Sequence, residues 1–230
     1  MATVSFGPAG TWSSFHAGVA MYVLENIPFD RSRASAYVVS GGALGLILLL
    51  YDDPRQLYER TRDACKIMSQ LKGLGIFAPF HTARVCREGL DYILPDDAHI
   101  RLGNRVFVGM TQFPTLRAVT HQGPFPTKEA LLNALLASSF IPGFFFRRFI
   151  PGFRGLIDGG FSHVHGPEPD RSIVVTIARY PESDVSADDN RIHLNFLDAD
   201  GYMEVFWLGY ASAQRSHEKI VEKLEAAGLM

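Results

Sequence analysis

The sequence of 230 residues predicts an α/β fold with three α/β/α layers, in which helices cover both faces of a mostly parallel central sheet. Short runs rich in β-branched residues alternate with longer stretches of helical apolar spacing along most of the chain. Two of these runs lead directly into glycine-containing turns, at Gly7–Gly10 and Ser40–Gly42. No repeat or low-complexity linker interrupts the pattern, so we expect a single domain over residues 1–230.

Composition narrows the functional class. Hydrophobic residues make up 47% of the chain, enough for a sizeable core, and a net charge of −2 with mixed acids and bases argues against a nucleic-acid partner. Cys65 and Cys86 have neither C-x-x-C nor zinc-ligand spacing, so we interpret them as core residues in a reducing compartment. Met1–Phe6 lacks a signal-peptide pattern, and Gly41–Leu50 is about half the roughly 20 residues that span a bilayer. We expect a soluble cytoplasmic protein that can bind peripherally to membranes.

The first predicted elements alternate strand and helix. Thr3–Phe6 is a predicted strand, and apolar residues at helical spacing follow from Trp12 to Val23. Ser35–Val39 is the second predicted strand. Asp53 and Pro54 mark a helix start, because Asp caps free N–H groups and Pro at the first helical position loses no hydrogen bond.

The same alternation continues to the end of the chain. The remaining predicted elements are a short helix at Thr82–Tyr92, a hairpin-like strand pair at Arg105–Gln112 and Thr115–His121, a helix capped by Thr127, a strand at Leu156–Gly160 ending in an acid on a sharp turn, strands at Ser172–Ala178 and Arg191–Phe196, and a last helix capped by Asp200 with Met203, Phe206, Trp207 and Tyr210 facing inward.

The stretch Ala36–Tyr51 has the most informative local pattern. A β-branched run leads straight into Ser40, Gly41 and Gly42, and an apolar helix-like run follows. A serine on such a tight turn has the geometry of a nucleophile elbow, with its hydroxyl exposed and the N-terminal amides of the new helix aimed at the same point. A serine that merely caps the helix gives the same pattern, so this stretch alone leaves both interpretations open.

Two further turns carry potential chemistry. The loop Gly7–Gly10 leaves backbone N–H groups free to hold a phosphate or an oxyanion. It lacks G-x-G-x-x-G and the P-loop lysine, so phosphate or nucleotide binding is a weaker hypothesis. The second turn places Asp158 before Gly159 and Gly160, although Asp-Gly turns also occur without any function.

The glycine-rich loop, the serine elbow and the Asp-Gly-Gly turn together resemble the patatin-like phospholipases and acyl hydrolases. Ser5–Gly18 looks like the opening S-F-x-G-C-G-F-L-G-x-Y-H-x-G of the animal triglyceride-lipase branch. Ala137–Phe144 is similar to the family segment A-S-x-x-I-P-x-F, and Glu204–Ala213 resembles a late helix of the family. The resemblance covers most of the chain in the same order.

This resemblance implies a patatin-like fold and a Ser–Asp dyad that needs no histidine and no cofactor. Ser40 would attack an ester carbonyl and Asp158 would accept its proton. The oxyanion would be held by backbone N–H groups of Ala9 and Gly10, with Gly41 as a further donor. The implied function is a lipid acyl hydrolase of phospholipase A, lysophospholipase or lipase type, acting on glycerolipid or phospholipid esters through an acyl-enzyme.

Departures from the family pattern keep an alternative open. Val38 stands where the elbow has its first glycine, Pro8 replaces the first loop glycine, and Ser13 replaces another usual glycine. The alternative is a catalytically impaired patatin-like domain that binds lipid or a protein partner. His163 and His165 could complete a triad or bind metal, but no third ligand has suitable spacing and the family needs none, so we expect no metal.

One aromatic segment is a candidate for contact with a membrane. An apolar tip with a basic collar suits the headgroup–acyl boundary of an anionic membrane, whereas burial in the core is the alternative. The membrane-facing candidates are Phe144, Phe145, Phe146 and Phe149, next to Arg147 and Arg148.

Overall fold

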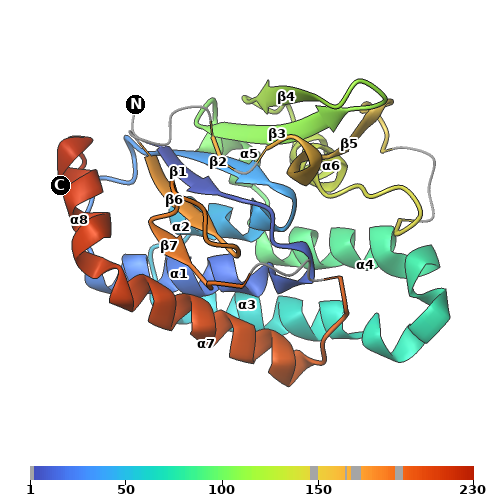
Figure 1. Ribbon diagram of the computed structural model, residues 1–230, viewed down its shortest axis with the longest axis horizontal. Coiled ribbons are helices and arrows are strands. Elements are labelled where there is room, and N and C mark those ends of the chain that lie inside the picture. Colours follow the sequence, from blue (N-terminus) through green and yellow to red (C-terminus); the bar gives the residue numbers. More distant parts are fainter. Residues whose placement is uncertain (1–2, 146–149, 164, 167–171, 190–193) are drawn as a thin grey trace.

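The computed structural model describes residues 3–145, 150–163, 165–166, 172–189 and 194–230. Within them one sheet has the strand order β4-β3-β2-β1-β6-β7, and β5 also pairs with β3 (Figure 1). Strands β1, β2, β3, β6 and β7 pair in parallel, whereas β4 and β5 are antiparallel to β3. The strands are β1 (Thr3–Phe6), β2 (Ser35–Val39), β3 (Val106–Gln112), β4 (Arg117–Gln122), β5 (Leu156–Asp158), β6 (Ser172–Thr176) and β7 (Val185–Ser186).

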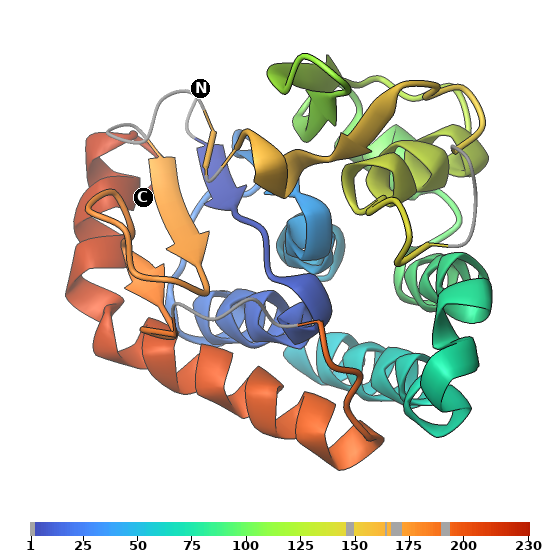
Figure 2. The same ribbon diagram turned by 45° about the vertical axis from the view of Figure 1, so that its right-hand side comes forward.

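Helices flank this mostly parallel sheet, which confirms the predicted fold class. Figures 1 and 2 show α1, α3 and α7 running side by side along the sheet. The α-helices are α1 (Ser14–Asn26), α2 (Ile47–Leu50), α3 (Pro54–Ser69), α4 (Ala78–Ile93), α5 (Ala98–Leu102), α6 (Lys128–Ser138), α7 (Ala199–Arg215) and α8 (His217–Ala226). The 3-10 helices are η1 (Gly10–Trp12), η2 (Ser40–Leu46), η3 (Lys72–Phe77) and η4 (Gly159–Phe161).

The parallel register places equivalent side chains of neighbouring strands on one face. Phe6, Val38 and Val108 lie side by side in β1, β2 and β3, and all three are buried in the main hydrophobic core. Buried residues of α1, α6 and α7 belong to the same core. Side chains alternate along a strand, so the residues that flank Phe6, Val38 and Val108 within their own strands point to the opposite face of the sheet.

His163 helps to hold the chain that follows β5 against this opposite face. A carbonyl can only accept a hydrogen bond, so Nε2 of His163 donates to the Met110 carbonyl oxygen at 3.0 Å. Its Nδ1 then accepts from the Tyr37 hydroxyl at 2.8 Å. Burial lowers the pKa of His163, which favours this neutral form. Both ring nitrogens are therefore engaged in structural hydrogen bonds.

Several predicted helix starts and strands are confirmed. The Asp53 side chain accepts from the Arg55 N–H at 2.9 Å, and the Thr127 hydroxyl oxygen accepts from the Ala130 N–H at 3.1 Å. The predicted strand at Arg191–Phe196 is only partly testable, since residues 190–193 lie outside the described residues. Its remaining residues, 194–196, are not in a strand.

Two predictions for the last helical region are wrong. Asp198, rather than Asp200, is the N-cap of α7, and its carboxylate accepts an N–H from the first turn at 2.9 Å. Helix α7 therefore begins at Ala199, and its buried side chains include Tyr202, Val205 and Phe206. Phe206 is fully buried as predicted, whereas Trp207 is 46% exposed.

Candidate active site

Ser40 sits on a sharp turn at the end of β2. Its φ of +53° lies in the left-handed region, which is strained for any residue other than glycine. The predicted apolar helix after the serine is a 3-10 helix over Ser40–Leu46, and an α-helix only over Ile47–Leu50. The strained residue and the tighter helix together turn the serine hydroxyl toward the ends of the strands.

Two glycines allow this turn to pack tightly. A Cβ at Gly42 would lie only 2.2 Å from the carbonyl oxygen of Phe6, so a larger residue would push η2 away from β1. A Cβ at Gly41 would lie 2.7 Å from the carbonyl oxygen of Gly10. These contacts bring the glycine-rich loop against the serine turn, as the sequence predicts for a shared site.

The structure brings Ser40 and Asp158 together across 118 residues of sequence. The Ser40 hydroxyl donates to Oδ2 of Asp158 at 2.6 Å, and both residues are buried. Asp158 is the last residue of β5, and its N–H donates to the Phe140 carbonyl oxygen at 2.8 Å. Its other carboxylate oxygen accepts from the Gly160 N–H at 2.7 Å. Pairing of β5 with β3 therefore fixes the carboxylate beside the serine.

Burial changes the acid–base chemistry of this pair. Desolvation raises the pKa of Asp158 to about 6, against the opposing effect of hydrogen bonds from Ser40 and from the Gly160 N–H. The carboxylate is still mostly ionised at neutral pH and is a stronger base than an exposed aspartate. The geometry therefore provides an acceptor for the serine proton without a histidine, since the nitrogens of His163 contact Tyr37 and Met110.

Ser138 supports the serine turn and has no functional role in the sequence prediction. The Ser40 N–H donates to Oγ of Ser138 at 2.8 Å, and the Ser138 hydroxyl donates to the Gly109 carbonyl oxygen at 2.6 Å. This buried bridge joins the end of α6 to β2 and β3. It also occupies the N–H of Ser40, which is thus unavailable to an oxyanion. The family-like segment Ala137–Phe144 marks the residue, but only the fold shows its partners.

The predicted oxyanion donors divide into two groups. Gly10 begins η1 and Gly41 is the second residue of η2, so their N–H groups precede the intrahelical hydrogen bonds. Both residues line the cavity in front of Ser40. Ala9 is buried beside them and does not line that cavity. Gly10 and Gly41 are therefore the better placed of the predicted donors.

His16 anchors the loop that carries these donors. The sequence predicts a packed core histidine, and the side chain is fully buried between the rings of Phe6 and Phe15. Its Nε2 donates to the Gly7 carbonyl oxygen at 2.9 Å. Desolvation lowers the pKa of His16 to about 3, so the ring stays neutral and keeps this hydrogen bond at physiological pH.

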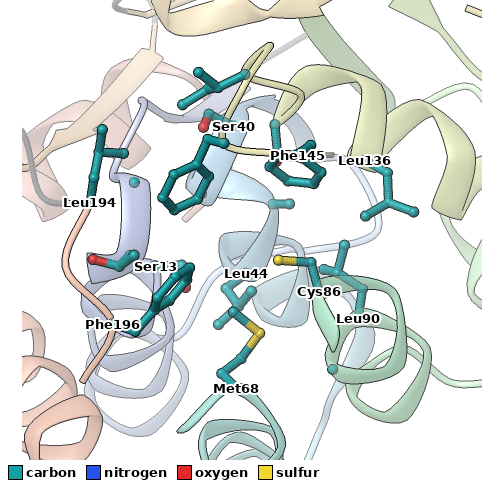
Figure 3. Close-up of a pocket in the computed structure, with 18 of the residues that line it drawn as sticks. Ser13, Ser40, Leu44, Met68, Cys86, Leu90, Leu136, Phe145, Leu194 and Phe196 are labelled. Carbon is teal, nitrogen blue, oxygen red and sulfur yellow. The ribbon is translucent and has the colours of Figure 1, made fainter. Parts of the chain in front are cut away.

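The Ser40 hydroxyl opens onto an apolar cavity of about 90 Å³ (Figure 3). Aliphatic and sulfur-containing side chains from η2, α3, α4 and α6 form its wall: Leu44, Met68, Cys86, Leu90 and Leu136. Cys65 and Cys86 are free thiols, and burial raises the pKa of each to about 12, so they are neutral wall residues. This lining fits a hydrocarbon chain held beside the serine.

The aromatic segment predicted to face a membrane lies differently. Phe145 is 3% exposed and belongs to the main core, so its prediction as a membrane-facing residue is wrong. Phe144 is half-buried and stacks on Phe196 with ring centroids 5.3 Å apart, and both rings line the cavity. Phe146 and Phe149 lie outside the described residues. The described part of this segment closes the cavity because its rings pack inward.

The described residues contain neither a metal-binding cluster nor a membrane-spanning helix. In this part of the chain no group of three or more His, Cys, Asp or Glu side chains is arranged to hold a metal ion. Of the helices in the described ranges, none combines the length and apolar character needed to cross a membrane.

Comparison with known proteins gives consistent matches. The family model described as "Patatin-like phospholipase" matches residues 5–166. The chain is 27% identical over 205 residues to mouse "1-acylglycerol-3-phosphate O-acyltransferase Pnpla3", covering 85% of this chain and 49% of that protein. It is 28% identical over 204 residues to rat "Patatin-like phospholipase domain-containing protein 2", covering 84% and 41%. The chain thus spans about half the length of these curated relatives or less.

A solved structure supports the fold independently of sequence. VipD from Legionella pneumophila superposes with a TM-score of 0.55 at 9% sequence identity, covering 94% of this chain and 66% of that one. At such low identity the similarity concerns the fold alone.

Replacement of Val38 tests whether this departure from the family elbow affects the site. Val38 is fully buried in the core, so Val38→Gly should lower the free energy of unfolding by about 2–4 kcal/mol through a cavity and added backbone freedom. We expect no increase in the rate of ester hydrolysis, because the serine already reaches Asp158. Denaturant unfolding and an aryl-ester assay measure both effects, and a faster variant would show that the valine impairs the turn.

Removal of the Ser138 hydroxyl tests its bridging role. Ser138→Ala leaves the Ser40 N–H and the Gly109 carbonyl without their buried partner, so the free energy of unfolding should fall by about 1–3 kcal/mol. Ester hydrolysis should lose kcat more than it changes KM. Ser139→Ala is the matched control for stability, since that hydroxyl bonds only to Leu135 in its own helix. Equal unfolding energies for the two variants would contradict the bridge.

Proposed function

The chain belongs to the patatin-like phospholipase family, and from this premise we propose that it is a lipid acyl hydrolase. Its substrates are carboxylic esters of glycerolipids or phospholipids. The observation that carries the proposal is the 2.6 Å hydrogen bond between the Ser40 hydroxyl and Asp158 Oδ2, at the wall of an apolar cavity. Such a pair combines a nucleophile, a base and a place for the acyl chain.

The first half of the reaction forms an acyl-enzyme. Oγ of Ser40 attacks the ester carbonyl carbon while its proton passes to Oδ2 of Asp158. Negative charge develops on the carbonyl oxygen, which the N–H groups of Gly10 and Gly41 stabilise from the cavity wall. When the tetrahedral intermediate collapses, the proton on Asp158 moves to the departing alcohol oxygen. The acyl group is then bonded to Ser40.

The second half releases the fatty acid. Asp158 takes a proton from a water molecule, whose oxygen attacks the acyl-enzyme, and the proton returns to Oγ of Ser40 as the ester bond breaks. A second alcohol can replace water in this step and would give acyl transfer. The mouse relative is named as an acyltransferase, so assays should measure both free fatty acid and transferred acyl groups.

The geometry gives little support to the catalytically impaired alternative. Val38 points into the core, on the face of β2 covered by helices, and does not separate Ser40 from Asp158. A Cβ placed on Gly160 would lie 3.1 Å from Cβ of Pro8, so this proline packs beside the acid turn. Both departures are accommodated by their neighbours while the hydrogen bond of the dyad is kept.

Ser40→Ala should abolish ester hydrolysis and labelling by a fluorophosphonate, because the variant lacks the proposed nucleophile. A fall of at least about a thousandfold in kcat is expected for loss of a nucleophile. Ser32→Ala removes an exposed hydroxyl bonded to Asp30 and should retain full activity and labelling. Turnover of a short-chain aryl ester by Ser40→Ala near the wild-type rate would reject the proposed function.

The pH dependence should report the titration of Asp158. Since the base must be ionised, kcat/KM should fall about tenfold per pH unit below about pH 6, where the raised pKa of Asp158 lies. Asp158→Asn cannot accept the proton and should lose activity nearly as completely as Ser40→Ala. His163→Ala should retain much more activity, and an equal loss would favour a histidine relay.

The ionised Asp158 carboxylate should also lower the free energy of unfolding in the pH range where it can act as the base. Its folded pKa exceeds the ordinary value of 3.8, so the native state binds more protons between about pH 4 and 6 and loses stability as pH rises through that range. Asp158→Asn should therefore raise the free energy of unfolding by about 1–3 kcal/mol at pH 8, and this gain in stability should vanish near pH 4. A loss of stability at pH 8 would contradict this assignment.

The buried Asp184 provides a matched control. Its carboxylate is paired with Lys219 and Lys223 and accepts the Val174 N–H, and the residue does not line the cavity in front of Ser40. Asp184→Asn should lower the unfolding free energy while keeping ester hydrolysis, the reverse of the result expected for Asp158→Asn.

A further inference from the structure

The hairpin of α3 and α4 ends in an exposed apolar tip. Helix η3 and the first turn of α4 present three large side chains, Ile76, Phe77 and Phe80, which are 85%, 61% and 56% exposed. We refer to these three residues as the hairpin tip. Adjacent exposed side chains of this size form a contiguous apolar surface, and such surfaces mark contacts with a partner or a membrane.

The hairpin tip lies near the C-terminal ends of the parallel strands, as does Ser40. The other end of the hairpin lies near the N-terminal ends of the strands. There the Tyr51 hydroxyl donates to the carbonyl oxygen of Ile93, so the residue just before α3 contacts the end of α4. Both helices are 16 residues long and run from there to η3 and back. Figures 1 and 2 show their connection on the side toward which the arrows of β1 and β3 point.

A buried apolar cluster joins the cavity wall to the hairpin tip. Met68 and Phe196 line the cavity, and both also pack against a small cluster of Leu71, Ala78 and Val85. This cluster lies at the base of the tip, since Ala78 directly follows Phe77 in the chain. Buried apolar packing is therefore continuous from the cavity wall to the base of the hairpin tip.

The charged side chains carried by the hairpin segment itself are all basic. Between residues 64 and 87 the charged side chains are Lys66, Lys72, Arg84 and Arg87, and the segment contains no Asp or Glu. All four pair with carboxylates outside the segment: Lys66 with Asp63, Lys72 with Asp198, Arg84 with Glu88 and Arg87 with Glu129. The Lys66 and Lys72 side chains are 58% and 53% exposed. Exposed ion pairs are weak, so these ammonium groups can exchange their carboxylates for lipid phosphates.

We propose that the hairpin tip inserts into the headgroup–acyl boundary of an anionic membrane. The basic side chains would then contact lipid headgroups, and the cavity between α3 and α4 would receive an acyl chain directly from the lipid layer. The entry of substrate rests on the proposed hydrolase function, whereas docking requires no turnover. This location differs from the predicted one at Phe145, a residue that is buried in the core.

The test uses binding of the full chain to sedimented vesicles made of equal parts phosphatidylcholine and phosphatidylserine. Binding is measured in the Ser40→Ala background, so that no lipid is consumed. Ile76→Ser combined with Phe77→Ser should weaken binding at least about tenfold, because two large apolar side chains no longer enter the membrane. In the active protein, the same double variant should hydrolyse a soluble aryl ester at the wild-type rate but vesicular lipid more slowly.

Ile100→Ser is the matched control. Ile100 is 71% exposed on α5, which leads into the N-terminal end of β3. This is the end of the strands away from Ser40, so vesicle binding should not change. If the parent binds vesicles of phosphatidylcholine alone more weakly than the mixed vesicles, this would support the role of the basic side chains. The proposal is rejected if the double variant binds like its parent, if the control loses binding equally, or if the parent binds no vesicles. Vesicle binding that persists without ester hydrolysis would reject the hydrolase function and leave docking intact.

Discussion

The buried hydrogen bond between Ser40 and Asp158 sets the requirements for the rest of the structure. A carboxylate removed from water and a serine with positive φ are both unfavourable, so neighbouring groups must hold them in place. The Gly160 N–H satisfies one carboxylate oxygen, and Ser138 satisfies the backbone of the serine. Pairing of β5 with β3 supplies the remaining constraint.

In the proposed function, the same apolar surroundings would serve both catalysis and substrate binding. Side chains such as Leu44 and Leu136 exclude water from the cavity, and this desolvation raises the pKa of Asp158 toward neutrality. A hydrocarbon chain prefers the same surroundings, because it is transferred from one apolar phase to another. Substrate that fills the cavity would exclude water further and would strengthen the base at the moment when it accepts the proton.

Local sequence patterns predicted what depends on local conformation. The strand before Ser40 and the caps Asp53 and Thr127 follow from neighbouring residues, and the resemblance to a family paired Ser40 with Asp158. Burial was less predictable, because Phe145 stands in a run of aromatic residues whose inward and outward positions depend on the rest of the fold. The partners of Ser138 were also beyond local reasoning, since Ser40 lies 98 residues away in sequence.

The α3–α4 hairpin connects the cavity with the proposed membrane contact. Its inner side chains, among them Met68 and Cys86, form the cavity wall, and its end exposes Ile76 and Phe77 to solvent. The core buries most large apolar residues elsewhere, whereas these two side chains stay largely in contact with solvent. A membrane-bound substrate would give this exposure a physical reason, because a hairpin that enters the lipid layer would bring the cavity close to the acyl chain. Lipid hydrolysis and surface binding would then depend on one structural unit.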